Sequence, residues 1–171
     1  MTANVGTYFA DTITKSQSGS GGYSESKYTK GVRQGITENV AVAAADNDGD
    51  TYTVGVMPSS AVLQRGSSEL SCTAITGGTD YDLGIYEIDE SADGWVGAEV
   101  DGDLFTDGDD LSSAADGIDP YQSIAAGDMG KPLWELLGLS ADPKKSYLVV
   151  LTGNTVGTAA GNVYLELGYT V

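Results

Sequence analysis

The stretch Leu70–Ile88, LSCTAITGGTDYDLGIYEI, decides the fold class of this chain. After its Thr-Gly-Gly-Thr segment, every second residue is a large apolar one: Tyr81, Leu83 and Ile85. This period of two predicts a β-strand with one buried face and one face in water. Because Gly77 and Gly78 can both adopt positive φ, we predict a tight hairpin turn at residues 76–79 that joins this strand to the one before it.

The same alternation recurs along the chain. Its apolar positions fall in three further runs: Ile36, Val40 and Val42; Tyr52, Val54 and Val56; and Val163, Leu165, Leu167 and Tyr169. Tyr147–Leu151 is apolar at every position, which is typical of a central strand buried on both faces. We expect Pro58 to end one strand and Arg65–Ser67 to bend another. The sequence therefore predicts an all-β protein, an antiparallel β-sandwich or jelly-roll-like domain of seven or eight strands.

One short helix is predicted at residues 131–138. Pro132 suits its first position and Gly138 suits its C-terminal cap. Three leucines share one face of this helix and are expected to close one end of the sandwich: Leu133, Leu136 and Leu137. We expect Trp134 to lie in the core.

Two segments have the composition of loops. Residues 153–162, GNTVGTAAGN, predict a hairpin loop. Residues 89–130 are acidic and rich in glycine, so we predict loops there with a short strand near Trp95–Val100. Three apolar side chains of this segment are expected to pack against one edge of the sandwich: Leu104, Phe105 and Leu111.

The N-terminal part differs from the rest in composition. Residues 1–31 contain SQSGSGGYSESKYTKG and have too few apolar side chains to fold by themselves. We expect an extended N-terminal arm at residues 1–31 and a β-sandwich domain at residues 32–171. A disordered tail is the alternative, but tyrosines spaced along a polar segment favour an arm that orders on a neighbouring subunit. Its expected interface residues are Tyr8, Lys15, Tyr23, Lys27, Tyr28, Lys30 and Arg33.

The charge of the chain excludes some partners. The net charge is −17, yet residues 1–45 carry a net of +1, so the other 126 residues carry −18. A body of this charge repels phosphates, and we expect no nucleic-acid partner. The longest apolar run, Tyr147–Leu151, is too short to span a membrane, and we expect no membrane partner. Because Met1–Asn4 begins neither a basic nor an apolar segment, we expect no secretory signal.

The residue types also lower the prospect of catalysis. The chain has no histidine, the commonest general base and a common transition-metal ligand. Its one cysteine, Cys72, alternates with apolar neighbours and is expected to be a small buried hydrophobe rather than a nucleophile. Carboxylate pairs for glycoside hydrolysis normally line an aromatic groove, whereas the acids here lie in predicted loops. Trp95 is expected in the core or at an interface, with carbohydrate stacking as the alternative. We expect no enzyme, no catalytic residues and no cofactor.

Two acidic segments raise the question of a metal. Asp46–Asp50 resembles the start of a calcium loop, but an EF-hand would need glycine at Thr51 and glutamate at Met57. A denser group could hold Ca²⁺, with a solvated acidic loop as the alternative: Asp101, Asp103, Asp107, Asp109 and Asp110. Because this group lacks a ligand spacing, we expect no metal site.

The order of these segments resembles a known family. A strand ending in AIT, a glycine turn, TDYDLGIYE and then DGDLFTDGDDLS are similar to decoration or cement proteins of tailed bacteriophages, over residues 51–171. The resemblance implies a structural protein on the outer surface of the capsid. It also implies a homo-oligomer, often a trimer, that contacts the major capsid protein and bridges capsid subunits. The alternative is a carbohydrate-binding or adhesive virion module of the head-fibre type.

Overall fold

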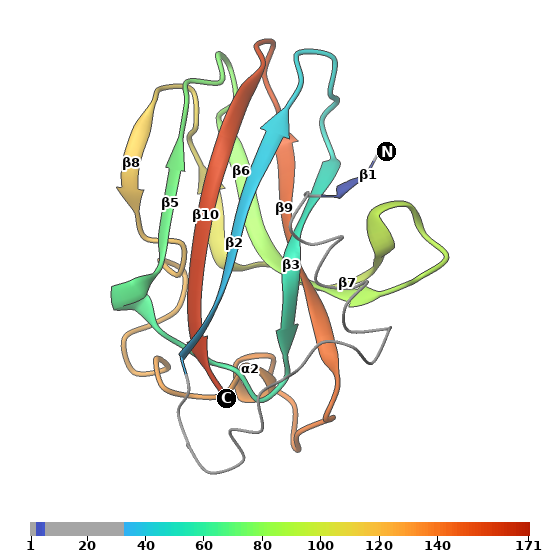
Figure 1. Cartoon of the computed structure of the whole chain (residues 1–171), viewed down its shortest axis with the longest axis vertical. Coiled ribbons are helices and arrows are strands. Elements are labelled where there is room, and N and C mark those ends of the chain that lie inside the picture. The colour runs from blue at the N-terminus through green and yellow to red at the C-terminus, as the bar shows by residue number, and fades with distance from the viewer. Residues whose placement is uncertain (1–2, 6–32) are drawn as a thin grey trace.

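The computed structural model describes residues 3–5 and 33–171, which include two β-sheets packed face to face (Figure 1). The first sheet, called here the β9 sheet, contains in spatial order β1 (Ala3–Val5), β3 (Asp50–Pro58), β9 (Ser146–Thr155), β6 (Asp80–Ile88) and β7 (Val96–Asp109). The second, the β10 sheet, contains β2 (Arg33–Val42), β10 (Gly161–Thr170), β5 (Glu69–Cys72) and β8 (Ala115–Ile118), and β4 (Val62–Leu63) pairs with β10.

The path of the chain between these sheets is that of a jelly roll. From β2 to β10 the chain crosses from one sheet to the other at most connections; the exceptions are β4–β5, within the β10 sheet, and β6–β7, within the β9 sheet. Among the described strands, every pair is antiparallel except β1 with β3, which is parallel. Leaving β1 and β4 aside, eight strands form two four-stranded sheets. The prediction of an antiparallel β-sandwich of jelly-roll type is confirmed.

The core lies between the two sheets and consists of the predicted alternating residues. Tyr81, Leu83 and Ile85 are fully buried on β6, and the four alternating residues of β10 are buried opposite them. Phe105 and Tyr121 meet edge to face, with ring centroids 5.2 Å apart. Each such side chain contributes about 1.5–3 kcal/mol by leaving water, so this layer is the main source of stability.

The predicted hairpin at residues 76–79 is wrong. β5 pairs with β10 and β8, whereas β6 pairs with β9 and β7, so the turn carries the chain from one sheet to the other. Only Gly77 of the two glycines has positive φ, at 82°. The backbone N–H of Ile75 donates to Leu111 O (2.9 Å), which draws the end of the preceding segment away from β6. The predicted hairpin at residues 153–162 is wrong for the same reason, because β9 and β10 belong to different sheets.

The prediction of loops over residues 89–130 is wrong in part. β7 is a strand of 14 residues, and β8 follows it in the other sheet. Several register shifts interrupt the β6–β7 pairing, which explains why the sequence of β7 has no regular alternation. Phe105 and Leu111 are fully buried and Leu104 packs against the core, so the placement of these three side chains is confirmed.

A bulge changes the buried face of β3. The register with β9 shifts between Thr53 and Gly55, so Met57 enters the core in place of the predicted Val56. Val56 instead packs against a second, smaller apolar cluster on the outer side of the β9 sheet. The other local features follow the prediction: Pro58 ends β3, and a 3-10 turn, η1 (Arg65–Ser67), separates β4 from β5.

The short helix is present as α2 (Leu133–Leu136), one turn long. Pro132 precedes it and Gly138 follows it with φ of 69°. Leu133 is fully buried, as expected, but Trp134 is only half-buried and its predicted place in the core is wrong.

The second apolar cluster covers the outer face of the β9 sheet. Its buried members are Tyr86, Leu148 and Val150. The segment that contains η2 (Asp93–Trp95) folds over them, and Trp95 packs there with positive φ of 62°. The hydroxyl of Thr53 donates to Gly94 O (2.8 Å) and ties this segment to β3. Trp95 therefore has a packing role, in agreement with the expectation of a core or interface position.

Gly84 allows β6 and β7 to approach closely, and this gives a test of the fold. A Cβ atom on Gly84 would lie 2.2 Å from the backbone C and O atoms of Gly102, so one strand would have to move. We expect Gly84→Ala to lower the free energy of unfolding by about 3 kcal/mol, measured by urea denaturation. Gly66→Ala is the control, because a Cβ there has no atom within 4 Å and its effect should be within about 0.5 kcal/mol. Equal stability of the two variants would contradict the β6–β7 packing.

Candidate assembly surface

The residues expected to contact a neighbour fall into two groups. Six lie outside the described residues: Tyr8, Lys15, Tyr23, Lys27, Tyr28 and Lys30. The seventh, Arg33, is exposed at the start of β2, and its guanidinium donates weakly to Ser67 O (3.4 Å). The structure thus places one predicted interface residue on an accessible sheet edge, and the interface itself stays a prediction.

The outward face of the β10 sheet contains a shallow groove of about 450 Å³. It lies over the pairing of β2, β10 and β5 and is lined by Thr37, Glu38, Asn39, Glu69, Ser71, Tyr164, Leu165 and Glu166. Tyr164 is 45% exposed, although most other tyrosines of the described chain are buried. Carboxylates beside an exposed aromatic ring suit a partner that offers cationic or hydroxyl groups.

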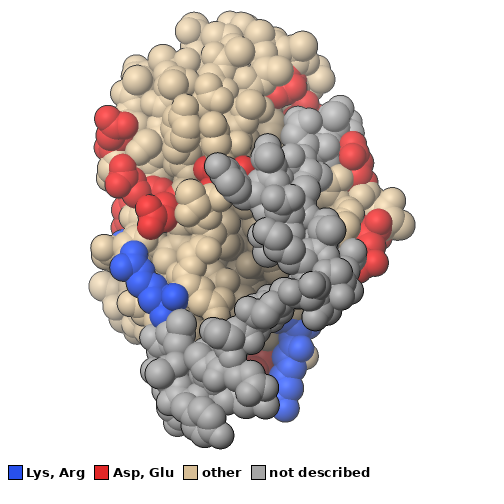
Figure 2. All heavy atoms as spheres, in the orientation of Figure 1, with Lys and Arg blue, Asp and Glu red and all other residues tan. Residues whose placement is uncertain are grey.

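Charge is distributed unevenly over this side of the molecule. Figure 2 shows acidic side chains at both margins of the face and uncharged side chains over its upper part. Three of the four basic side chains in residues 46–171 are already in ion pairs: Arg65 with Asp119, Lys131 with Asp128 and Lys145 with Glu87. The described body therefore presents carboxylates to a partner and has few cations left for phosphates.

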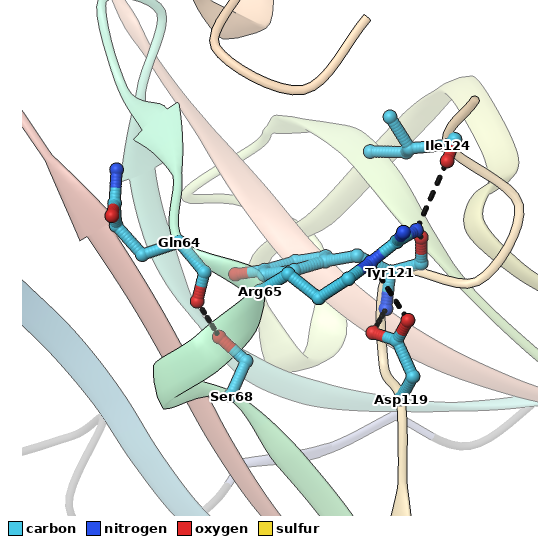
Figure 3. Close-up of polar contacts among 6 residues, drawn as sticks. All are labelled: Gln64, Arg65, Ser68, Asp119, Tyr121 and Ile124. Carbon is cyan, nitrogen blue, oxygen red and sulfur yellow. Dashed lines mark hydrogen bonds and ion pairs between the residues drawn. The ribbon is translucent and has the colours of Figure 1, made fainter. Parts of the chain in front are cut away.

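Arg65 organises one end of the domain (Figure 3). Its Nη2 donates to the backbone oxygens of Tyr121 (2.6 Å) and Ile124 (3.0 Å), and its Nε lies 2.8 Å from Asp119 Oδ2. Asp119 Oδ1 accepts from the Tyr121 N–H (3.0 Å), and the Tyr121 hydroxyl donates to Gly168 O on β10 (3.3 Å). Burial raises the pKa of Tyr121, so this hydroxyl stays a donor. The function of Arg65 is to fix the loop after β8 against the sandwich.

The carboxylates of Asp46–Asp50 serve the turn before β3. Asp46 Oδ2 accepts from the Ala43 N–H (2.7 Å) and the Tyr52 hydroxyl (2.8 Å). Asp48 Oδ1 accepts from the Val156 N–H (3.0 Å), which joins this turn to the β9–β10 connection. These carboxylate oxygens are therefore used in hydrogen bonds that hold the turn and join it to neighbouring segments. The acidic residues that make this segment resemble a calcium loop thus have a structural role in the turn.

The acidic residues of β7 are in contrasting environments. Asp109 is 8% exposed; Gln122 Nε2 donates to its Oδ1, and its Oδ2 has no hydrogen-bond partner among the described residues. Burial raises the pKa of Asp109, and burial together with Asp103 raises that of Asp101. The described residues contain no group of three or more His, Cys, Asp or Glu side chains placed to hold a metal ion.

Cys72 is buried beside β8, as expected, and burial raises the pKa of its thiol. A thiol in this state is protonated near neutral pH and is a poor nucleophile. In the described part of the chain, no helix is long and apolar enough to cross a membrane.

The comparisons with known proteins concern the fold. A scan against protein-family models and a search of curated proteins gave no match. The chain is similar to a solved chain in the capsid of Ralstonia phage GP4, with a TM-score of 0.56 and 15% identity over 84% of this chain and 86% of that one. It also matches a chain of the cyanophage Pam1 capsid asymmetric unit, with a TM-score of 0.45 and 13% identity over 83% and 86% of the two chains. The first of these likenesses confirms the sandwich architecture across most of the chain.

The buried charge on β7 gives a pH-dependent prediction. Because the folded pKa of Asp109 lies above its unfolded value, its stabilising contribution is present at low pH and is lost as the pH rises through the folded pKa. We expect Asp109→Asn to raise Tm at neutral pH by about 2–4 °C, the shift that about 1 kcal/mol causes in a domain of this length. At about pH 3 and below the gain should vanish, because the carboxyl of Asp109 is then mostly protonated in both the folded and the unfolded protein.

Asp110→Asn is the matched control for this measurement. Two hydrogen bonds from Ser112 lower the pKa of Asp110, so loss of its charge should slightly lower Tm at neutral pH. Calorimetry of both variants across the acid range measures the two opposite signs. A gain for Asp109→Asn that is the same at acid and neutral pH would contradict the role of the buried charge.

Proposed function

We propose that this protein is a structural component of a virion, a decoration or cement protein bound to the outer surface of the capsid. The observation that carries the proposal is the fold likeness to a chain of the Ralstonia phage GP4 capsid, which extends over more than four-fifths of both chains. The described residues offer no histidine, metal cluster or reactive thiol, which is consistent with a role without catalysis.

The electrostatics support a position outside the shell. The acidic body has most of its cations in ion pairs, so packaged DNA would repel it. An outward-facing protein avoids that repulsion. Like charges on neighbouring copies would also keep the acidic margins apart unless a segment that carries cations lies between them.

Residues 1–33 contain four basic side chains that can take this place between acidic surfaces. In the proposed assembly, the tyrosines of this segment are buried against the major capsid protein or a neighbouring copy, and its lysines meet acidic surface. The residues with this role are those expected from the sequence: Tyr8, Lys15, Tyr23, Lys27, Tyr28, Lys30 and Arg33. The copies would form a homo-oligomer, in our proposal a trimer.

A carbohydrate-binding or adhesive function of the virion surface is the second candidate. The groove on the β10 sheet favours it, because an exposed Tyr164 lies there beside Asn39, Glu69 and Glu166. Aromatic stacking with amide and carboxylate hydrogen bonds suits a sugar. The two candidates predict different effects of changes at Tyr164 and in the arm.

Deletion of residues 1–31 tests the first candidate. The domain should stay folded with a similar Tm, because the deleted segment adds little to the core, while occupancy on isolated capsids should fall at least tenfold. The variant Tyr23→Ser/Tyr28→Ser keeps the length and charge of the chain and should lose a large part of this occupancy. Binding of the intact protein should also weaken with added salt.

Tyr164→Ala is the control for this experiment. It should leave capsid occupancy unchanged under the first proposal and abolish adhesion to glycans under the second. Unchanged occupancy after deletion of residues 1–31 would contradict a bridging arm, and loss of folding would show that these residues belong to the core.

A further inference from the structure

β1 has an unusual place in this fold. It has three residues, Ala3–Val5, and pairs in parallel with the outer edge of β3 (Figure 1). The register joins Ala3 to Thr51, Asn4 to Tyr52 and Val5 to Thr53. β2, the next strand of the chain, begins at Arg33 and belongs to the other sheet. Residues 6–32 therefore connect two strands on opposite sides of the sandwich.

The edge of β3 is a preformed acceptor for a strand. Its other edge pairs with β9 over eight positions, and Tyr52 and Val54 fix it to the core. Thr51 and Thr53 are buried, and the Thr53 hydroxyl bonds Gly94 O. Beyond β1, no strand in the described pairing covers this edge, and the three acceptor residues, 51–53, include no proline and no charged side chain, although Asp50 immediately precedes them. Unpaired backbone groups at such an edge bind extended segments by strand addition.

The donor strand is short and joined by a long connection. Three paired residues give few hydrogen bonds, so β1 can leave and return without unfolding of the sandwich. A connection of 27 residues spans at most about 90 Å when extended, which is about twice the width of a domain of this size. The same three pairs can therefore form within one chain or between two chains.

We propose that the β3 edge accepts residues 3–5 of a second copy of this chain, so that neighbouring subunits exchange their N-terminal strands. The partner is a second copy because its Ala-Asn-Val segment already has a fitting register on Thr51–Thr53. Whether the β3 edge binds the β1 of its own chain or that of a second copy depends on their relative concentrations. The β1 of the same chain has an effective concentration of about millimolar, set by its tether. Copies held side by side reach that concentration, and in this respect the inference rests on the proposed function.

Disulfide trapping with separated donor and acceptor chains tests the exchange. All variants carry Cys72→Ala, so the native thiol takes no part. One chain carries Ala3→Cys and the other Thr51→Cys, with C-terminal tags of different mass, and they are mixed at about millimolar concentration under mild oxidation. A disulfide between these two chains can form only in trans. We expect a mixed dimer on non-reducing gels at least tenfold above the background of mismatched pairs.

The controls use the register. Ala3→Cys mixed with Thr53→Cys places the thiols two residues out of register and should cross-link at background level. A single chain with both Ala3→Cys and Thr51→Cys, in dilute solution, should close within itself, which verifies the β1–β3 pairing. The proposal is overturned if this chain cross-links only within itself at every concentration, or if neither arrangement cross-links. The mixtures contain no capsid, so failure of capsid binding leaves this result unaffected.

Discussion

Burial of Tyr147–Leu151 on both of its faces is the constraint on which the rest of the structure depends. The odd-numbered residues of this segment face the β10 sheet and form the main core, while Leu148 and Val150 face outward. The outward pair is covered because the segment with η2 folds back over the sheet and brings Trp95 onto it. A central strand that is apolar on both faces must be covered on both sides. Here the β10 sheet covers one face and the segment with η2 covers the other.

Much of the fold could be predicted, because the alternation of apolar residues records which face of each strand is buried. That pattern does not record which sheet a strand joins. Residues 76–79 and 153–162 therefore suit a hairpin and a crossing between sheets equally well. The bulge in β3 and the long strand β7 were also beyond local reasoning, since each depends on a partner strand: β3 on β9, and β7 on the close approach of Gly84 to Gly102. In both cases tertiary contacts override the local preference.

The candidate surface was predictable in its charge but not in its geometry. The sequence indicates an acidic body, and the ion pairs of the structure strengthen that description. The role of Arg65 was missed, although one signal was available: it is the one basic residue between Arg33 and Lys131. Such an isolated cation suggests a specific partner, and its partners here are the backbone oxygens of a loop. The groove on the β10 sheet is formed by residues from three strands that are far apart in the sequence, so no local sequence pattern predicts it.

In the function that we propose, this jelly roll is attached to the outside of a capsid and bridges its subunits. Cryo-electron microscopy of purified particles that contain the chain is the direct test of this attachment. We expect density for the sandwich on the outer surface of the shell, with an N-terminal segment that extends from β2 onto a neighbouring subunit. Density for the sandwich on the inner surface beside the DNA, or only at a place away from the outer shell, would contradict this placement.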